Sequence, residues 1–257
     1  MAVLLVDIGN SRIKWARCAD GRLGRRQAAA HSGWDAADYL RRLFGLKAPA
    51  RRMLVSSVAG AGVNRTLARA ARRAGVAAQF VKVPRRAGGV RVGYLEPWRL
   101  GVDRFVAAVG AHHLFPGVAV CVVGVGTAMT VDLIDALGRH RGGVIIPAPA
   151  LMIEGLLEKT QGIRRRARGG ARGGAGLFAR STRAGILEGA RYAAAGLIDR
   201  AVQEAEPLIG RKPLVVLTGG EAAVVRPLVR SACVGVPDLV LRGLAVLAHA
   251  VSPGRRR

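Results

Sequence analysis

Two short segments of similar design constrain the fold of this 257-residue chain more than any other feature. Residues 7–11 (Asp-Ile-Gly-Asn-Ser) follow the apolar run 3–6, and residues 124–128 (Gly-Val-Gly-Thr-Ala) follow the apolar run 120–123. Each pattern predicts a buried strand that ends in glycine and small polar residues and then turns into a second strand. Such a turn directs backbone N–H groups at one point, which suits a phosphate. The repetition predicts a duplicated chain that binds a nucleotide between its two halves.

The predicted elements follow the same order in the two parts of the chain, with a hairpin first and then alternating strands and helices. In the first part we expect strands at 2–8, 12–17, 22–30, 53–58 and 77–83, helices at 35–45, 64–74 and 103–114, and a loop at 84–100. In the second part we expect strands at 118–123, 128–134, 143–146 and 214–217, helices at 150–159, 182–205, 221–231 and 241–250, and a Gly- and Arg-rich loop at 160–181.

This order predicts an α/β protein with two similar domains, residues 1–115 and 116–257. It matches the duplicated ribonuclease-H-like fold of the actin, Hsp70 and sugar-kinase superfamily. The length allows two domains of ordinary size. Because 51% of the residues are hydrophobic and only 4% are aromatic, the cores must consist mainly of alanine, valine and leucine.

The net charge of +25 raises the question of a nucleic-acid partner. Arginine far outnumbers lysine, and alanine and glycine are also abundant, which is the pattern that a G+C-rich genome produces at tolerant surface sites. The arginines are scattered, and aromatic residues that would stack on bases are not interleaved with them. We therefore do not expect nucleic acid as a partner, although the positive field would attract ATP and other anions.

The cysteines and the hydropathy pattern favour a reduced, cytoplasmic protein. Cys18, Cys121 and Cys233 are far apart and show no metal-binding spacing. The apolar run at the N-terminus is short, has no preceding basic region and meets Asp7, so it does not resemble a signal peptide. No run of about 18 apolar residues predicts a membrane span.

The first turn has two interpretations. Glycine, asparagine and serine are ordinary turn residues, so residues 9–11 could form only a tight hairpin. A carboxylate at the end of a buried strand is costly when unpaired, which favours a role for Asp7. It could hold Mg²⁺, directly or through water, beside the phosphates. Lys14 on the second strand either meets phosphate oxygens or is a solvated charge.

Gly101-Val102-Asp103-Arg104 opens a predicted helix at the proposed domain junction. In one interpretation Asp103 is a helix N-cap and Arg104 is a surface residue. In the other, Asp103 is a general base beside a cation that binds a carboxylate. Phosphoryl transfer to an alcohol commonly uses such an Asp to accept the hydroxyl proton.

The second part offers further candidates. The hydroxyl of Thr127 can bond a phosphate oxygen, whereas Thr130 and Asp132, on one strand face, either serve the site or face solvent. Residues 218–220 (Thr-Gly-Gly) either cap a helix or let an adenosine approach the backbone. His112 and His113 have no ligand partners at metal spacing, so we interpret them as structural.

At these residues the chain resembles the type III pantothenate kinases, the CoaX-like family, nearly from end to end. The matching segments, specific in this order and spacing, are 7–11, 56–58, Tyr94 with Pro97, 101–104, 126–132, 142–147, 181–182 and 218–220.

The resemblance implies a role for each matching residue. The residues implied to bind ATP are Asp7, Ile8, Gly9, Asn10, Ser11, Arg12, Ile13, Lys14, Gly126 and Thr127. Those implied to bind pantothenate are Tyr94, Gly101, Val102, Asp103, Arg104 and Thr182, with Asp103 as the proton acceptor. The family also implies a homodimer with the pantothenate pocket at the subunit interface, a divalent metal, and a monovalent cation such as K⁺ or NH₄⁺.

Two positions depart from the family pattern. The family usually has an Asp that helps to hold the monovalent cation where this chain has Gly124. Glycine has no side chain for this purpose, so the cation site is either absent or formed by carbonyl groups. Ala148 stands where a glycine usually follows the proline.

The sequence thus predicts a dimeric pantothenate kinase that makes 4′-phosphopantothenate from pantothenate and ATP, the first step of coenzyme A biosynthesis. One alternative is another kinase or a phosphatase on the same fold. The second is a non-catalytic or regulatory relative, for example one associated with nucleic acid. Gly124 and the positive charge suggest this alternative, whereas Asp7 and Asp103 argue against it.

Overall fold

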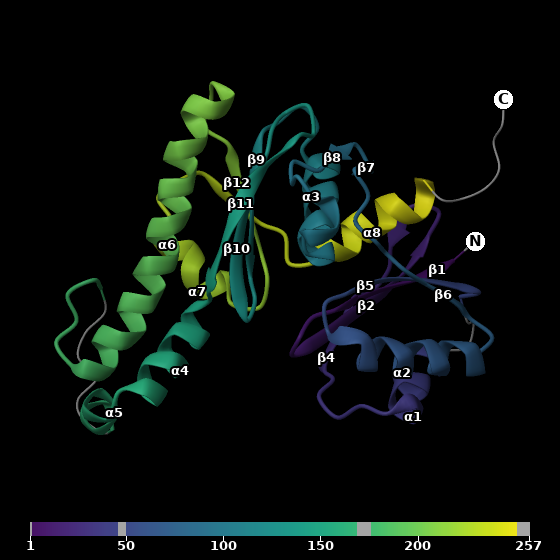
Figure 1. Ribbon diagram of the computed structural model, residues 1–257, viewed down its shortest axis with the longest axis horizontal. Coiled ribbons are helices and arrows are strands. Elements are labelled where there is room, and N and C mark those ends of the chain that lie inside the picture. The colour runs from purple at the N-terminus through teal and green to yellow at the C-terminus, as the bar shows by residue number, and fades with distance from the viewer. Residues whose placement is uncertain (1, 46–49, 169–175, 251–257) are drawn as a thin grey trace. The chain divides into compact units, whose positions relative to one another are not determined.

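The computed structural model describes residues 2–45, 50–168 and 176–250, which form two compact units (Figure 1). The first unit contains residues 2–117, 136–140 and 238–250, and the second contains residues 118–135 and 141–237. The division of the chain into domains 1–115 and 116–257 stays a prediction. Within the described residues, no helix has the length and apolar character needed to cross a membrane.

The sheet of the first unit has the order β3-β2-β1-β5-β6, and β4 also pairs with β2. Its strands are β1 (Val3–Ile8), β2 (Arg12–Ala19), β3 (Arg22–Leu23), β4 (Gln27–Ala30), β5 (Arg52–Ser57) and β6 (Ala77–Phe80). β1 pairs antiparallel with β2 and parallel with β5. The parallel pair needs a crossover, and the chain between β1 and β5 supplies it.

Helices of the first unit are α1 (Ala36–Tyr39), η1 (Leu40–Phe44), α2 (Gly60–Arg73), η2 (Pro97–Arg99), α3 (Val102–Leu114) and α8 (Leu239–Ala250). Leu4, Val6 and Ile8 of β1 pack in one core with residues of α1 and α2. Because side chains alternate along a strand, Asp7 lies on the opposite face of the sheet, the side where α8 packs (Figure 1).

The sheet of the second unit has the order β11-β10-β9-β12-β13. Its strands are β9 (Val120–Val125), β10 (Ala128–Ile134), β11 (His140–Pro147), β12 (Leu214–Thr218) and β13 (Cys233–Gly235). The helices are α4 (Pro149–Lys159), α5 (Gln161–Ala167), α6 (Thr182–Ile209), α7 (Ala222–Val225) and η3 (Arg226–Leu228). α6 packs its Ala194, Ile198 and Val202 against one face of the sheet.

The two sheets repeat one topology, as the sequence predicts. β9 pairs antiparallel with β10 and parallel with β12, just as β1 pairs with β2 and β5. The central row of the first sheet is Lys14–Asp7–Ser56, and the matching row of the second is Thr130–Gly124–Thr218. Gly124 therefore occupies the position in the second unit that Asp7 occupies in the first.

Several predicted boundaries are wrong. The strand expected at 22–30 is divided into β3 and β4, and the expected loop 84–100 contains η2 and the short strands β7 (Arg86–Ala87) and β8 (Val90–Arg91). The helix expected from residue 64 already begins at Gly60. The expected helix 221–231 is shorter and is followed by β13, which the sequence analysis missed.

The Gly- and Arg-rich segment 160–181 is also not a continuous loop, because residues 161–167 form α5. Thr160 ends α4 and precedes α5, and its hydroxyl donates to the carbonyl of Leu156 at 2.6 Å. Part of the predicted loop, residues 169–175, lies outside the described residues.

Candidate active site

The first phosphate turn begins where β1 ends. Ile8 and Ile13 close the hairpin as a cross-strand pair, and both side chains are fully buried. Asn10, Ser11 and Arg12 between them are exposed. The Gly9 N–H donates to the Arg12 carbonyl at 2.9 Å, which holds the turn closed. Any contact of Ile8 or Ile13 with a nucleotide must therefore come from the main chain.

Asp7 carries the most perturbed carboxyl of this turn. Burial in the sheet raises the pKa of Asp7 to about 7, and the negative charge of Asp103 adds to the rise. The positive charge of Lys14 and the hydroxyl of Ser56 lower the pKa, but by less than burial raises it. A carboxyl with such a pKa is only partly ionised at neutral pH, and a nearby cation would favour its ionised form.

Asp103 lies in the first turn of α3, in the same unit as Asp7. The N-cap position is Gly101 and not Asp103, so the N-cap interpretation of Asp103 is wrong. Its Oδ1 instead accepts from the backbone N–H of Arg104 at 2.9 Å. A Cβ at Gly101 would lie 2.7 Å from this Oδ1, so a side chain at this position would push the carboxylate away from its present place.

Arg104 and Tyr94 form a polar pair beside Asp103. Arg104 is only 7% exposed, which contradicts its interpretation as a surface residue. Its Nη1 donates to the hydroxyl oxygen of Tyr94 at 3.1 Å. A buried guanidinium next to a tyrosine hydroxyl provides directed donors of the kind that bind a carboxylate.

His140 supports Tyr94 and was not predicted from the sequence. Its ring lies 5.6 Å from the Tyr94 ring, and its Nδ1 accepts from the Gly93 N–H at 3.4 Å. His140 is buried and belongs to residues 136–140, which join the first unit. No local motif marks this residue, because it contacts Gly93 and Tyr94, and Gly93 lies 47 residues earlier in the chain.

The second phosphate turn has a different chemistry at its strand end. Gly124 stands between Thr130 and Thr218 in the register, so neutral hydroxyls replace the charged row of the first unit. The Gly126 N–H donates to the Ala128 carbonyl at 3.0 Å, and Gly126 and Thr127 are exposed. Asp132 is buried, at 2% exposure, which excludes its interpretation as a solvent-facing residue.

The Thr-Gly-Gly turn packs directly on the second phosphate turn. Gly219 has a φ of +104°, and a Cβ there would lie 2.1 Å from the Val125 carbonyl oxygen, so only glycine fits. The next residue but one, Glu221, donates its N–H to the same carbonyl at 3.1 Å. Its carboxylate accepts from the Ala150 N–H at 3.1 Å in the first turn of α4.

Thr182 is the first residue of α6 and is exposed. Ser181 is the N-cap, and its hydroxyl accepts from the Ala184 N–H at 3.2 Å. Thr182, Gly126 and Thr127 thus belong to the second unit, whereas the other predicted site residues belong to the first.

The described residues contain no group of three or more His, Cys, Asp or Glu side chains that could hold a metal by themselves. A magnesium ion beside phosphates needs only one or two carboxylates, because water and phosphate oxygens supply its other ligands. Asp7, with its raised pKa, fits such an ion because a cation would offset the cost of its buried charge.

Comparison with known proteins gives a consistent assignment. The sequence profile described as "Type III pantothenate kinase" matches residues 3–204. The chain belongs to the type III pantothenate kinase family. It is 35% identical to the type III pantothenate kinase of Nitrosococcus oceani, over 99% of this chain and 96% of the relative. It is 37% identical to that of Herminiimonas arsenicoxydans, over 98% of this chain and 99% of the relative.

Solved structures support the fold of this pantothenate kinase. A putative 2-dehydro-3-deoxygalactonokinase from Sinorhizobium meliloti superposes with a TM-score of 0.56 at 15% identity, over 98% of this chain and 99% of the other. The predicted fold of the actin, Hsp70 and sugar-kinase superfamily is confirmed. The chain is thus an enzyme that phosphorylates pantothenate in coenzyme A biosynthesis, and nothing supports the non-catalytic alternative.

Proposed function

We propose that Asp103 is the general base of this kinase and accepts the proton of the pantothenate hydroxyl as the γ-phosphate of ATP is transferred. The observation that carries this proposal is the pair of acidic side chains in the first unit. Burial is the main cause of the raised pKa of Asp7, and the negative charge of Asp103 adds to it, so the two carboxylates share one electrostatic environment. A base beside the metal and phosphates is what in-line transfer to an alcohol requires.

Pantothenate binds, in this proposal, at Tyr94, at residues 101–104 and at Thr182. The support is the buried guanidinium of Arg104, which donates to the Tyr94 hydroxyl at 3.1 Å. A guanidinium beside a hydroxyl is a pair of groups that suits a carboxylate. Val102 and Gly101 contribute backbone at the start of α3, where a helix N-terminus favours negative charge. Thr182 contributes a hydroxyl from the start of α6.

ATP binds at the two phosphate turns, at residues 7–14 in the first unit and at Gly126 and Thr127 in the second. The support is the exposure of both turns and their closure by internal backbone hydrogen bonds. Asp7 would hold Mg²⁺, directly or through water. When bound, the metal supplies positive charge that offsets the charge developing on the phosphates.

The monovalent cation would rest on neutral oxygens. Gly124 provides no carboxylate, and its register neighbours Thr130 and Thr218 offer hydroxyl groups. Neutral oxygens can coordinate K⁺ or NH₄⁺, but with less electrostatic attraction than a carboxylate gives. We therefore propose a weak cation site at this position.

A cytoplasmic homodimer completes the proposal. Cys18, Cys121 and Cys233 are free, as in a reducing compartment. The second unit exposes a series of apolar side chains on β11 and α4, namely Val144, Ile145, Leu151 and Leu156. Exposed apolar side chains that gather on a surface commonly mark an interface.

The assignment of the base is tested with Asp103→Asn. We expect turnover to fall by at least about 10²-fold, because an amide cannot accept the proton. A coupled assay of ADP release, with and without pantothenate, measures the loss. The matched control is Glu204→Gln on α6, which changes an exposed carboxylate that pairs with Arg200 and should leave turnover unchanged. Turnover near that of the wild type in Asp103→Asn would remove Asp103 from the mechanism.

A further inference from the structure

His31 contacts the first phosphate turn although it lies outside every motif. It follows β4 directly and is 5% exposed. Its Nε2 lies 2.8 Å from the carbonyl oxygen of Gly9. A carbonyl oxygen can only accept, so Nε2 carries the proton and the imidazole is the donor. Gly9 is then held at both its carbonyl and its N–H, since the N–H donates to the Arg12 carbonyl at 2.9 Å.

The second unit holds its turn from the equivalent place. Ala148 directly follows β11, the strand that pairs with β10 as β4 pairs with β2. The Ala148 N–H donates to the carbonyl of Thr127 at 3.2 Å. In both units, the residue after the strand that pairs with the second strand of the hairpin therefore donates to a carbonyl of the phosphate turn. The first unit uses a side chain where the second uses the backbone.

Aromatic packing fixes the orientation of the His31 ring. Trp34 lies edge to face with it at 6.4 Å between ring centroids and also packs against Tyr39 at 5.2 Å. The backbone N–H of Trp34 donates to the His31 carbonyl at 3.1 Å, which closes a tight turn. Within the described chain, His31 Nδ1 has no hydrogen-bond partner, so the contact with Gly9 is the polar interaction that the ring provides.

We propose that His31 is a positioning residue for ATP, because its hydrogen bond to Gly9 holds the exposed segment 10–12 in the conformation that receives the phosphates. This inference rests on the proposed binding of ATP at the first turn. Loss of the donor leaves the Gly9 carbonyl unsatisfied, and the turn must then rearrange to find another partner. The effect falls on ATP, since residues 94–104 do not depend on this contact.

Two substitutions at position 31 separate the hydrogen bond from the packing. His31→Gln keeps an N–H donor of similar reach but loses the ring, whereas His31→Phe keeps a ring against Trp34 but loses the donor. We expect His31→Phe to raise the Kd for MgATP, measured by calorimetry, about tenfold, which corresponds to about 1.4 kcal/mol. His31→Gln should stay within about threefold of the wild type, or about 0.7 kcal/mol. The KM for pantothenate at saturating ATP should not change in either variant.

The reverse pattern, with weak binding in His31→Gln and normal binding in His31→Phe, would show that the ring matters and the donor does not. Equal loss in both variants would also overturn the proposal, because only one of them lacks a donor. Ser11→Ala tests the turn itself. If Ser11→Ala leaves the Kd for MgATP unchanged, the assignment of the ATP site is wrong. If Ser11→Ala weakens binding but His31→Phe does not, the ATP site stands and only the role of His31 is refuted.

A measurement on the wild-type protein covers the case in which a variant does not fold. Nitrogen-15 spectra of the histidine side chains report which ring nitrogen carries the proton. We expect the Nε2–H tautomer for His31 and a change in its Nε2 shift on addition of MgATP but not of pantothenate. A shift that does not respond to MgATP would contradict the proposal.

Discussion

At the scale of single residues, the two strand ends of this kinase show how one topology carries two chemistries. Asp7 and Gly124 hold the same place in the two sheets, but only Asp7 brings a charge. Its neighbours differ accordingly, with Lys14 beside the carboxylate and Thr130 beside the glycine. The cation requirements of the two turns should therefore differ as well.

The substitution Gly124→Asp tests this difference. We expect the wild type to show weak activation by K⁺ or NH₄⁺ relative to Na⁺, and the variant to show stronger activation because a full charge is added. The new Cβ would lie 3.1 Å from Thr130 Oγ1, so this hydroxyl must shift slightly to admit it. Initial rates with each cation at fixed ionic strength measure the effect. Strong K⁺ dependence in the wild type that Gly124→Asp leaves unchanged would show that position 124 does not control the cation.

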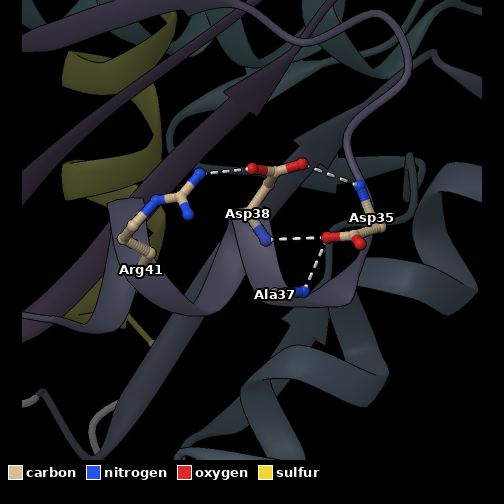
Figure 2. Close-up of polar contacts among 4 residues, drawn as sticks. All are labelled: Asp35, Ala37, Asp38 and Arg41. Atoms are coloured by element: carbon tan, nitrogen blue, oxygen red, sulfur yellow. Dashed lines mark hydrogen bonds and ion pairs between the residues drawn. The ribbon is translucent and has the colours of Figure 1, made fainter.

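At the scale of secondary-structure elements, α1 illustrates a short helix that depends on its cap. Asp35 Oδ1 accepts from the N–H groups of Ala37 at 2.8 Å and Asp38 at 2.9 Å, and Asp38 accepts in return from the Asp35 N–H (Figure 2). Arg41 Nη2 donates to Asp38 at 2.6 Å. The hydrogen bond from the Asp38 N–H is the main reason that the pKa of Asp35 is lowered. The cap holds α1 directly after the segment that contains His31 and Trp34.

We expect Asp35→Ala to lower the melting temperature at pH 7, because two backbone N–H groups lose their acceptor. A lowered pKa means that the folded state favours the ionised carboxyl of Asp35. This stabilisation is therefore present above the pKa of the unfolded state, about 3.9, and is lost as the pH falls through the pKa of the folded state. The difference between wild type and variant, measured by calorimetry from pH 7 to pH 3, should therefore shrink. Asp35→Asn keeps the acceptor and should melt near the wild type at pH 7. An unchanged melting temperature in Asp35→Ala would contradict the stabilising role of the cap.

At the scale of the whole molecule, the apolar side chains of β11 and α4 are the strongest indication of assembly. Ile145 of β11 is 59% exposed, and Val144, whose side chain points to the other face of the strand, is 46% exposed. The large positive charge argues against association driven by charge alone, since like charges repel. Apolar burial in a dimer would offset that repulsion.

We expect a homodimer at micromolar concentration by light scattering. Ile145→Asp should weaken it at least about tenfold, because burying an unpaired carboxylate costs more than about 1.4 kcal/mol. Leu208→Asp on α6 is the matched control, since Leu208 is similarly exposed, at 62%, but lies outside this surface. A monomer with full activity would refute the pantothenate pocket that is shared between subunits.

Much of the architecture could be predicted from the sequence because its signals are local. The apolar runs 3–6 and 120–123, each followed by glycine, predict the two central strands and their turns. The predicted limits of β10, Ala128–Ile134, are confirmed without change. The pattern could not predict where 22–30 divides into two strands, because that depends on which residues pair with β2.

What the sequence by itself determined is the order of the longer strands and helices, the motifs of the site and the family, since these depend on residue order and spacing. Only the tertiary structure decided which residues support the site. His31 and Glu221 reach the two phosphate turns, and His140 reaches Tyr94, through pairing and packing between segments distant in sequence. It also decided the chemistry of Asp7, because burial in the sheet, and not its neighbours in the chain, is the main cause of its raised pKa.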